Sequence, residues 1–175
     1  NCAEYYDKAK LITLMVGRTI NDIFPKKKVK IGDTAIEVKN ISTNGVFEDI
    51  SFKVRKGEIL GVAGLVGAGR TEVARAIFGL DPIDSGEIIM NDKSLKIRTP
   101  YDAISNGIVM VPEDRRELGL VMCRSIRENI SLPNLEMLFP GPLINEGQEV
   151  KLVNEMVKKL QIKTPYINLK VNKLS

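Results

Sequence analysis

Apolar and polar residues alternate with a period of two in the first half of the chain, a pattern that predicts β-strands. Between residues 35 and 39, Ile36 and Val38 alternate with polar positions, and the same alternation returns over residues 50–54. Successive side chains of a strand point to opposite faces, so both segments are typical of strands with one buried face. Residues 55–58 then read as a tight turn.

Two further segments are apolar on both faces. Residues 59–63 and 108–111 contain no polar side chain. Such short runs are typical of parallel strands in the centre of a sheet, where both faces are covered. Residues 87–90 form another short strand pattern, and we expect them to join residues 35–54 in a separate antiparallel layer.

Helical periodicity appears in three places, and helix-start signals mark two more. Apolar residues recur every three or four positions over residues 4–16, 73–80 and 148–160. Thr99–Pro100 has the residue types of an N-cap and a first helical turn. Ser125–Glu128 has the spacing of a capping box. The intervening residues 133–147 contain three prolines and two glycines, so we expect a loop there.

Composition excludes several classes of chemistry. The chain has 175 residues, 26 basic and 22 acidic side chains, a formal net charge of +4, no His and two Cys. Without His there is no Ser-His-Asp or Cys-His pair and no His-ligated zinc. Cys2 and Cys123 are too far apart in sequence for a CxxC motif, and we expect no disulfide framework. No run approaches the roughly 18 apolar residues of a membrane helix. Residues 26–30 are rich in lysine but contain no aromatic residue, which favours a solvated linker over a nucleic-acid contact.

The most informative segment is the glycine-rich stretch Gly64–Thr71, which fits the pattern GxxxxG[K/R][ST] with Arg70 in the usual lysine position. A loop without bulky side chains lets successive backbone N–H groups converge on phosphates, and a helix that begins there adds its positive dipole end. Arg70 supplies a cation for the outer phosphates, and the hydroxyl of Thr71 is suited to Mg²⁺. The alternative is a plain glycine turn, but a strand pattern before the loop and a helix pattern after it favour phosphate binding.

Several stretches together resemble a known family, the ATP-binding cassette (ABC) transporter ATPases. These stretches read GEILGVAGLVGAGRTEVARAIFGL, SGEI and GIVMVPEDRRELGL, and ITLMVGR near the beginning resembles the tail of a preceding cassette. The most similar type is the cytoplasmic subunit of bacterial importers for ribose, galactose or xylose, which carries two cassettes in one chain. This chain resembles the N-terminal part of the second cassette. An unrelated phosphate-loop protein, such as a small GTPase or a kinase, is the other alternative, but a lysine would be expected at position 70.

The resemblance implies an α/β fold: the cassette core of P-loop NTPases, with parallel strands around the Walker A loop and helix, plus an antiparallel β layer. It also implies four regions. Residues 1–24 would be the helical tail of a preceding cassette and the start of a linker, and residues 25–34 the linker. Residues 35–134 would form the nucleotide-binding core with its antiparallel β subdomain, and residues 135–175 an incomplete helical subdomain.

The resemblance further implies ATP and Mg²⁺ as cofactors. The expected nucleotide-binding residues are Gly64, Val66, Gly67, Ala68, Gly69, Arg70, Thr71, Glu72 and Phe47. The expected metal-binding residues are Thr71 and Glu113, the latter at the position of the Q-loop glutamine.

Four of these positions depart from the family pattern or have an alternative role. Arg70 keeps the charge of the lysine but is a planar fork instead of a compact ammonium. Glu72 replaces Ser or Thr, and its carboxylate would weaken phosphate binding up to about a thousandfold unless it meets solvent or a cation. Glu113 is either an Mg²⁺ ligand or a surface residue paired with a neighbouring arginine. Phe47 is either the aromatic platform for adenine or a residue at the edge of the core.

The family's signature helix, Walker B aspartate, catalytic carboxylate and switch histidine have no counterpart in these residues, which end in Leu174–Ser175. We therefore expect part of a sugar-import ATPase at the cytoplasmic face of a bacterial membrane, inactive in hydrolysis by itself. The alternative is a non-catalytic nucleotide-binding or scaffolding module that supports a sister site. Expected partners are a sister cassette or second copy, transmembrane permease subunits and, indirectly, a periplasmic or extracellular sugar-binding protein; no nucleic acid is expected. The chain does not begin with Met, so we expect it to be part of a longer one.

Overall fold

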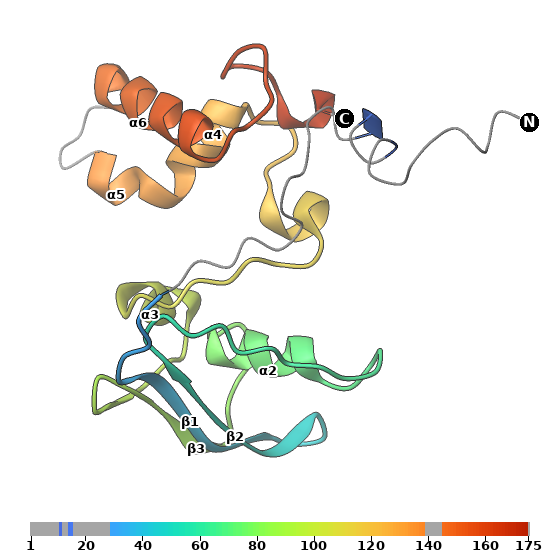
Figure 1. Cartoon of the computed structure of the whole chain (residues 1–175), viewed down its shortest axis with the longest axis vertical. Coiled ribbons are helices and arrows are strands. Elements are labelled where there is room, and N and C mark those ends of the chain that lie inside the picture. Colours follow the sequence, from blue (N-terminus) through green and yellow to red (C-terminus); the bar gives the residue numbers. More distant parts are fainter. Residues whose placement is uncertain (1–10, 12–13, 16–28, 139–144, 175) are drawn as a thin grey trace, which may run out of the picture. The chain divides into compact units, whose positions relative to one another are not determined.

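The computed structural model describes residues 11, 14, 15, 29–138 and 145–174. The predicted helix over residues 4–16 lies outside these described residues or touches them only at isolated positions, and residues 25–28 of the predicted linker lie outside them. The chain divides into two compact units, Asn1–Ile108 and Val109–Ser175 (Figure 1). Each unit is described by itself below.

An antiparallel sheet forms the base of the first unit. Its strands are β1 (Thr34–Thr43), β2 (Phe47–Arg55), β3 (Ser85–Met90) and β4 (Lys93–Leu95), in the order β2-β1-β3-β4. The period-two segments and residues 87–90 therefore form the antiparallel layer that the sequence predicts. The pairing of Val38 with Phe52 on one side and with Ile88 on the other brings apolar side chains of three strands together.

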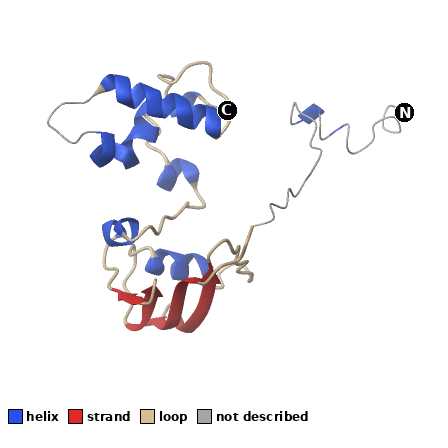
Figure 2. Ribbon diagram, turned by 60° about the vertical axis from the view of Figure 1, so that its left-hand side comes forward, coloured by secondary structure: helices blue, strands red, loops and turns tan. Residues whose placement is uncertain are grey.

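One face of this sheet is covered by helix α2 (Arg70–Ile77), as Figures 1 and 2 show. Its buried residue Ala76 joins Val38, Ile41 and Phe47 in the core of the unit. The small side chain of Ala76 allows the helix to approach the strands closely, while Val73 and Ile77 pack beside it, as helical spacing predicts. This packing fixes the N-terminal end of α2 relative to the sheet.

A short helix, α3 (Pro100–Ser105), ends the first unit, and it begins at the predicted residue. The side chain of Thr99 accepts a hydrogen bond from the amide of Asp102, and the carboxylate of Asp102 accepts one from the amide of Thr99. These reciprocal bonds are a capping box with aspartate as its acid, and they satisfy N–H groups that a helix start leaves unpaired.

The two predicted parallel strands do not appear as strands in the structure. Residues 59–63 and 108–111 are not strands, and within the described part of the chain no strand pairs with them. Ile59 is 97% exposed and Val111 92%. A strand that is apolar on both faces needs hydrogen-bonded neighbours and covering helices, and the described residues provide neither for these segments.

Over residues 109–138 and 145–174, the second unit consists of helices and loops, apart from one isolated bridge between Ser125 and Lys170 (Figure 2). Its main helices are α4 (Ile126–Ser131), α5 (Leu135–Leu138) and α6 (Glu146–Lys159). Short helical turns complete it: η2 (Arg115–Gly119), η3 (Leu132–Asn134) and η4 (Val171–Lys173). Ser125 and Glu128 form the predicted capping box of α4.

Helix α6 confirms the prediction for residues 148–160, and its Val153 is fully buried. The expected loop over residues 133–147 is wrong in part, because η3 and α5 occupy residues 132–138. Pro133 lies in the first turn of η3, where a missing N–H costs nothing, so proline starts this helical stretch instead of breaking it. Residues 139–144 lie outside the described residues. None of the helices in the described part of the chain combines the length and apolar character that crossing a bilayer requires.

Candidate functional site

The glycine-rich loop leads directly into α2, so the sheet-packed helix positions it. Gly67 and Gly69 have φ angles of 80° and 77°, the left-handed region that glycine enters without strain. Gly69 is the N-cap of α2, and no side chain caps the helix there. The first turn of the helix therefore directs its N–H groups and the positive end of its dipole towards the loop.

The glycine-rich loop has unpaired backbone N–H groups within the described ranges, and part of its surface has no neighbouring atoms. The amides of Val66, Gly67 and Gly69 donate to no protein acceptor within the described ranges. A side-chain carbon added at Gly67 would have no neighbour within 4 Å, so the surface of the loop there is free for a ligand. Several unpaired amides beside a helix N-terminus are the donor set that binds phosphate groups in proteins.

Two other groups that the sequence predicts as phosphate donors instead form hydrogen bonds within the loop itself. The amide of Ala68 donates to the carbonyl oxygen of Leu65 at 3.1 Å. The guanidinium Nη2 of Arg70 donates to the same oxygen at 3.4 Å. The loop therefore has free amides at its exposed surface, while the guanidinium of Arg70 binds back to Leu65 near the start of the loop.

The carboxylate of Glu72 lies in the first turn of α2 and is exposed. One turn further along, Arg75 forms two hydrogen bonds with Asp81, Nε to Oδ2 at 2.7 Å and Nη2 to Oδ1 at 2.9 Å. These bonds raise the pKa of Arg75 and lower the pKa of Asp81, and the negative charge of Glu72 adds to the rise at Arg75. Glu72 is therefore open to solvent, which reduces its repulsion of phosphate, and its charge acts on Arg75 only at a distance, since the guanidinium is hydrogen-bonded to Asp81.

The two predicted metal ligands belong to different units. Thr71 is half-buried in the first turn of α2, and Glu113 lies two residues before η2 in the second unit. The position of Thr71, adjacent to Arg70 and to the free amides, suits a hydroxyl that holds Mg²⁺ beside a bound phosphate. A shared metal site of Thr71 and Glu113 stays a prediction.

Phe47 lies in the core of the first unit, with 9% of its surface exposed, at the start of β2. This is the location that its alternative role, a residue of the core edge, requires. The exposed neighbour Val46 belongs to the β1–β2 turn, and its carbonyl oxygen is 3.9 Å from the position that a side-chain carbon on Gly69 would occupy. The turn before Phe47 thus lies beside the loop, while Phe47 itself is buried in the core.

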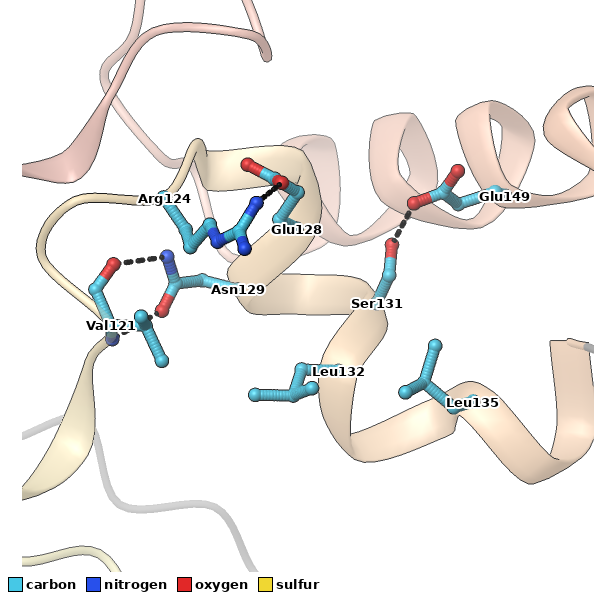
Figure 3. Close-up of a pocket in the computed structure, with 8 residues that line it drawn as sticks. All are labelled: Val121, Arg124, Glu128, Asn129, Ser131, Leu132, Leu135 and Glu149. Atoms are coloured by element: carbon cyan, nitrogen blue, oxygen red, sulfur yellow. Dashed lines mark hydrogen bonds and ion pairs between the residues drawn. The ribbon is translucent and has the colours of Figure 1, made fainter. Parts of the chain in front are cut away.

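The second unit contains a separate hollow that sequence reasoning did not find. It has a volume of about 360 Å³ and lies between α4, η3 and α6 (Figure 3). Val121, Leu132 and Leu135 supply its apolar lining, and the hydrogen bond from Ser131 to Glu149 borders it (Figure 3). Its lining comes from residues 121–135 and from Glu149, and it forms only because α4 and the turn after it pack against α6, which no local pattern indicates.

Comparison with known proteins identifies the class to which this fold and loop belong. The family model of ABC transporters matches residues 47–175. A ribose/galactose/methyl galactoside import ATP-binding protein of Rhizobium etli is 56% identical over 99% of the chain and 33% of its own length. The ribose import ATP-binding protein RbsA of Bacillus subtilis is 46% identical over 90% of the chain and 32% of its own length.

The chain therefore belongs to the ABC transporter family, and it spans about a third of the length of these curated relatives. Solved structures agree on the fold. The protein cbiO1 of Clostridium perfringens, part of the ABC transporter complex cbiONQ, matches with a TM-score of 0.62 at 18% identity, over 82% of this chain and 56% of that one. An ATP-binding cassette in its ADP conformation matches with a TM-score of 0.62 at 20% identity, over 81% of this chain and 59% of that one. The ABC cassette fold class is thereby confirmed.

Proposed function

We propose that this chain is part of the ATP-binding subunit of a bacterial ABC importer for a sugar of the ribose or galactose type. The family match over residues 47–175 covers the loop, the rest of the first unit after β1 and all of the second unit, and the import proteins of Rhizobium etli and Bacillus subtilis are similar over most of the chain. We propose that the chain forms the N-terminal part of the second cassette of such a subunit.

The observation that carries the proposal is the group of free amides of Val66, Gly67 and Gly69 at the N-terminus of α2. These donors would bind the phosphates of ATP, while Gly64 and Ala68 shape the turn. Arg70 would reach the outer phosphates after leaving Leu65. Phe47 would contact adenine only if its ring left the core, so it is the weakest member of the proposed site.

Thr71 would bind Mg²⁺ through its hydroxyl. Glu113, a residue of the second unit, is proposed as a further Mg²⁺ ligand. Bound Mg²⁺ supplies positive charge that offsets the charge of the phosphates. Glu72, which is exposed to solvent, would then lie beside the metal–phosphate group without blocking it. The described residues contain no cluster of three or more acidic, Cys or His side chains, so the phosphates themselves would have to provide further ligands.

The second unit is proposed to serve the partners of the importer. Its hollow between α4, η3 and α6 has an apolar lining and lies on the helical unit, where a transmembrane permease subunit would dock from the cytoplasmic side. A sister cassette or a second copy would complete the nucleotide site. A periplasmic or extracellular sugar-binding protein would be linked indirectly through the permease. We further propose that these 175 residues alone do not hydrolyse ATP, because they include no counterpart of the family's catalytic carboxylate.

One observation favours the second candidate function, a scaffolding module that supports a sister site. Arg70 and the amide of Ala68 both donate to the carbonyl oxygen of Leu65, so two of the groups expected at the phosphates are hydrogen-bonded within the loop. A loop that satisfies its own donors keeps its shape without nucleotide. The two functions differ in affinity: a binding site takes up Mg-ATP at micromolar concentration, and a scaffold does not.

Isothermal titration of the 175-residue chain with Mg-ATP tests the proposal. We expect saturable binding that weakens about tenfold in Thr71→Val, which removes the hydroxyl and keeps the shape. Thr34→Val is the matched control, because Thr34 is exposed at the start of β1. Absence of binding, or equal affinity in Thr71→Val and the wild type, would contradict the proposed nucleotide site.

A further inference from the structure

The side chain of Arg70 runs back across the loop that precedes it. Its Nη2 reaches the carbonyl oxygen of Leu65, five residues earlier. A side-chain carbon added at Gly64 would lie 3.4 Å from Cδ and 3.6 Å from Nε of Arg70. The aliphatic part of Arg70 therefore passes over Gly64, whose missing side chain makes the room.

The carbonyl oxygen of Leu65 is the acceptor on which the loop closes. It receives the amide of Ala68 at 3.1 Å and the guanidinium of Arg70 at 3.4 Å. A carbonyl oxygen has two lone pairs, so these two donors satisfy it fully. The contact joins the beginning of the loop, at Leu65, to its end, at the first residue of α2.

We propose that Arg70 is an internal ligand of its own loop. Its guanidinium holds Leu65–Gly69 in shape when no phosphate is bound, and a polyphosphate that binds to the free amides must compete with Leu65 for this cation. Arg70 thus determines the affinity of the loop in two opposite ways, since it attracts phosphate by charge and resists it by its contact with Leu65. The polyphosphate rests on the function proposed above, whereas the internal contact does not.

The choice of arginine, and not lysine, follows from this geometry. The guanidinium extends beyond the position of a lysine ammonium, and its Nη2 atom makes the contact at a distance that already lies near the limit of a hydrogen bond. A lysine at position 70 would keep the positive charge and lose the contact with Leu65. Arg70→Lys therefore separates the two effects, and Arg70→Ala removes both.

Hydrogen exchange of the loop amides and titration with Mg-ATP and with inorganic pyrophosphate test the proposal on the 175-residue chain. Without ligand, we expect the amide of Ala68, which donates to Leu65, to exchange about two- to tenfold faster in Arg70→Lys and Arg70→Ala than in the wild type. We expect Arg70→Lys to bind Mg-ATP and pyrophosphate about two- to tenfold more tightly, because no contact has to be broken. Arg98→Lys is the matched control, since Arg98 is exposed and precedes α3.

A second variant keeps the test decisive if the Arg70 variants fold poorly by circular dichroism. Gly64→Ala keeps the arginine residue but adds a methyl group 3.1 Å from Cβ of Ala68 and 3.4 Å from Cδ of Arg70, so we expect Ala68 to shift and the contacts with Leu65 to loosen. It should accelerate exchange of the same Ala68 amide.

The outcomes separate this proposal from the proposed function. Equal loop exchange in the wild type, the folded Arg70 variants and Gly64→Ala overturns the internal ligand, even if all of them bind nucleotide. Faster exchange without binding of Mg-ATP or pyrophosphate by any variant supports the internal ligand and contradicts the nucleotide site. Faster exchange with equal or weaker binding by Arg70→Lys overturns the competition.

Discussion

Arg127 of α4 and Glu149 of α6 form an ion pair in which one carboxylate oxygen accepts two hydrogen bonds. Nε of Arg127 lies 2.9 Å and Nη2 lies 2.5 Å from Oε2 of Glu149. The other oxygen of Glu149 accepts a hydrogen bond from the hydroxyl of Ser131 at 2.6 Å. The side chain of Glu149 is only 8% exposed, so this pair joins two helices at a site with little competing water.

We expect Glu149→Gln to lower the free energy of unfolding by about 2 kcal/mol, because it leaves the charge of Arg127 without its partner. Urea unfolding followed by far-UV circular dichroism measures this change. Glu155→Gln is the control, since Glu155 is exposed on the same helix. Equal losses in the two variants would mean that the pair contributes nothing specific.

The same carboxylate predicts a dependence of stability on acid. The hydrogen bonds of Arg127 hold the pKa of Glu149 below its ordinary value of 4.5, with help from Ser131 and against burial and the charge of Glu128. A carboxyl group with a lowered folded pKa stabilises the fold fully above its unfolded pKa, and this contribution is lost as the pH falls through the folded pKa. We therefore expect stability to decline below about pH 4.5, with a smaller decline in Glu149→Gln. Unfolding free energies measured between about pH 6 and pH 3 test this, and parallel curves for both proteins would refute it.

Local signals in the sequence predicted much of the fold. The strands over 34–43 and 47–55 follow from alternation that a single segment contains. The start of α3 follows from Thr99 as N-cap with Pro100 in the first turn, and the start of α4 follows from the capping box of Ser125 and Glu128. In each case the residues that determine the structure are neighbours in the chain.

Features that depend on partners elsewhere could not be predicted in this way. Residues 59–63 have the composition of a buried strand, but a strand exists only where another strand pairs with it, and the segment does not reveal whether one does. The position of Phe47 in the core depends on its packing against α2 and β1. In the candidate site, the glycine pattern predicted the turn, but the contact of Arg70 with Leu65 is a choice of side-chain conformation that no spacing encodes.

The exposed position of Glu72 predicts a modest effect on nucleotide binding. A carboxylate that faces solvent and interacts with Arg75 repels phosphate far less than a buried one. We expect Glu72→Gln to strengthen binding of Mg-ATP about two- to fivefold, as is typical of exposed charges. Titration calorimetry at low and high salt measures the effect, which should shrink as salt increases. A change as large as a hundredfold would show that Glu72 points to the phosphates.

Two glycines with similar backbone angles predict very different costs of substitution. Gly86 in β3 has a φ angle of 92°, and a side-chain carbon there would lie 2.5 Å from the carbonyl oxygen of Asn40 and 2.6 Å from Cα of Ile41. Gly45 in the β1–β2 turn has a φ angle of 74°, but a side-chain carbon there would meet nothing within 4 Å. Alanine at Gly45 therefore bears only the cost of a left-handed conformation, about 1 kcal/mol. Alanine at Gly86 must also push β3 away from β1, so we expect a loss of more than about 3 kcal/mol. Urea unfolding of both variants compares the two costs, and a loss at Gly86 no larger than at Gly45 would show that the β1–β3 pair does not approach this closely in solution.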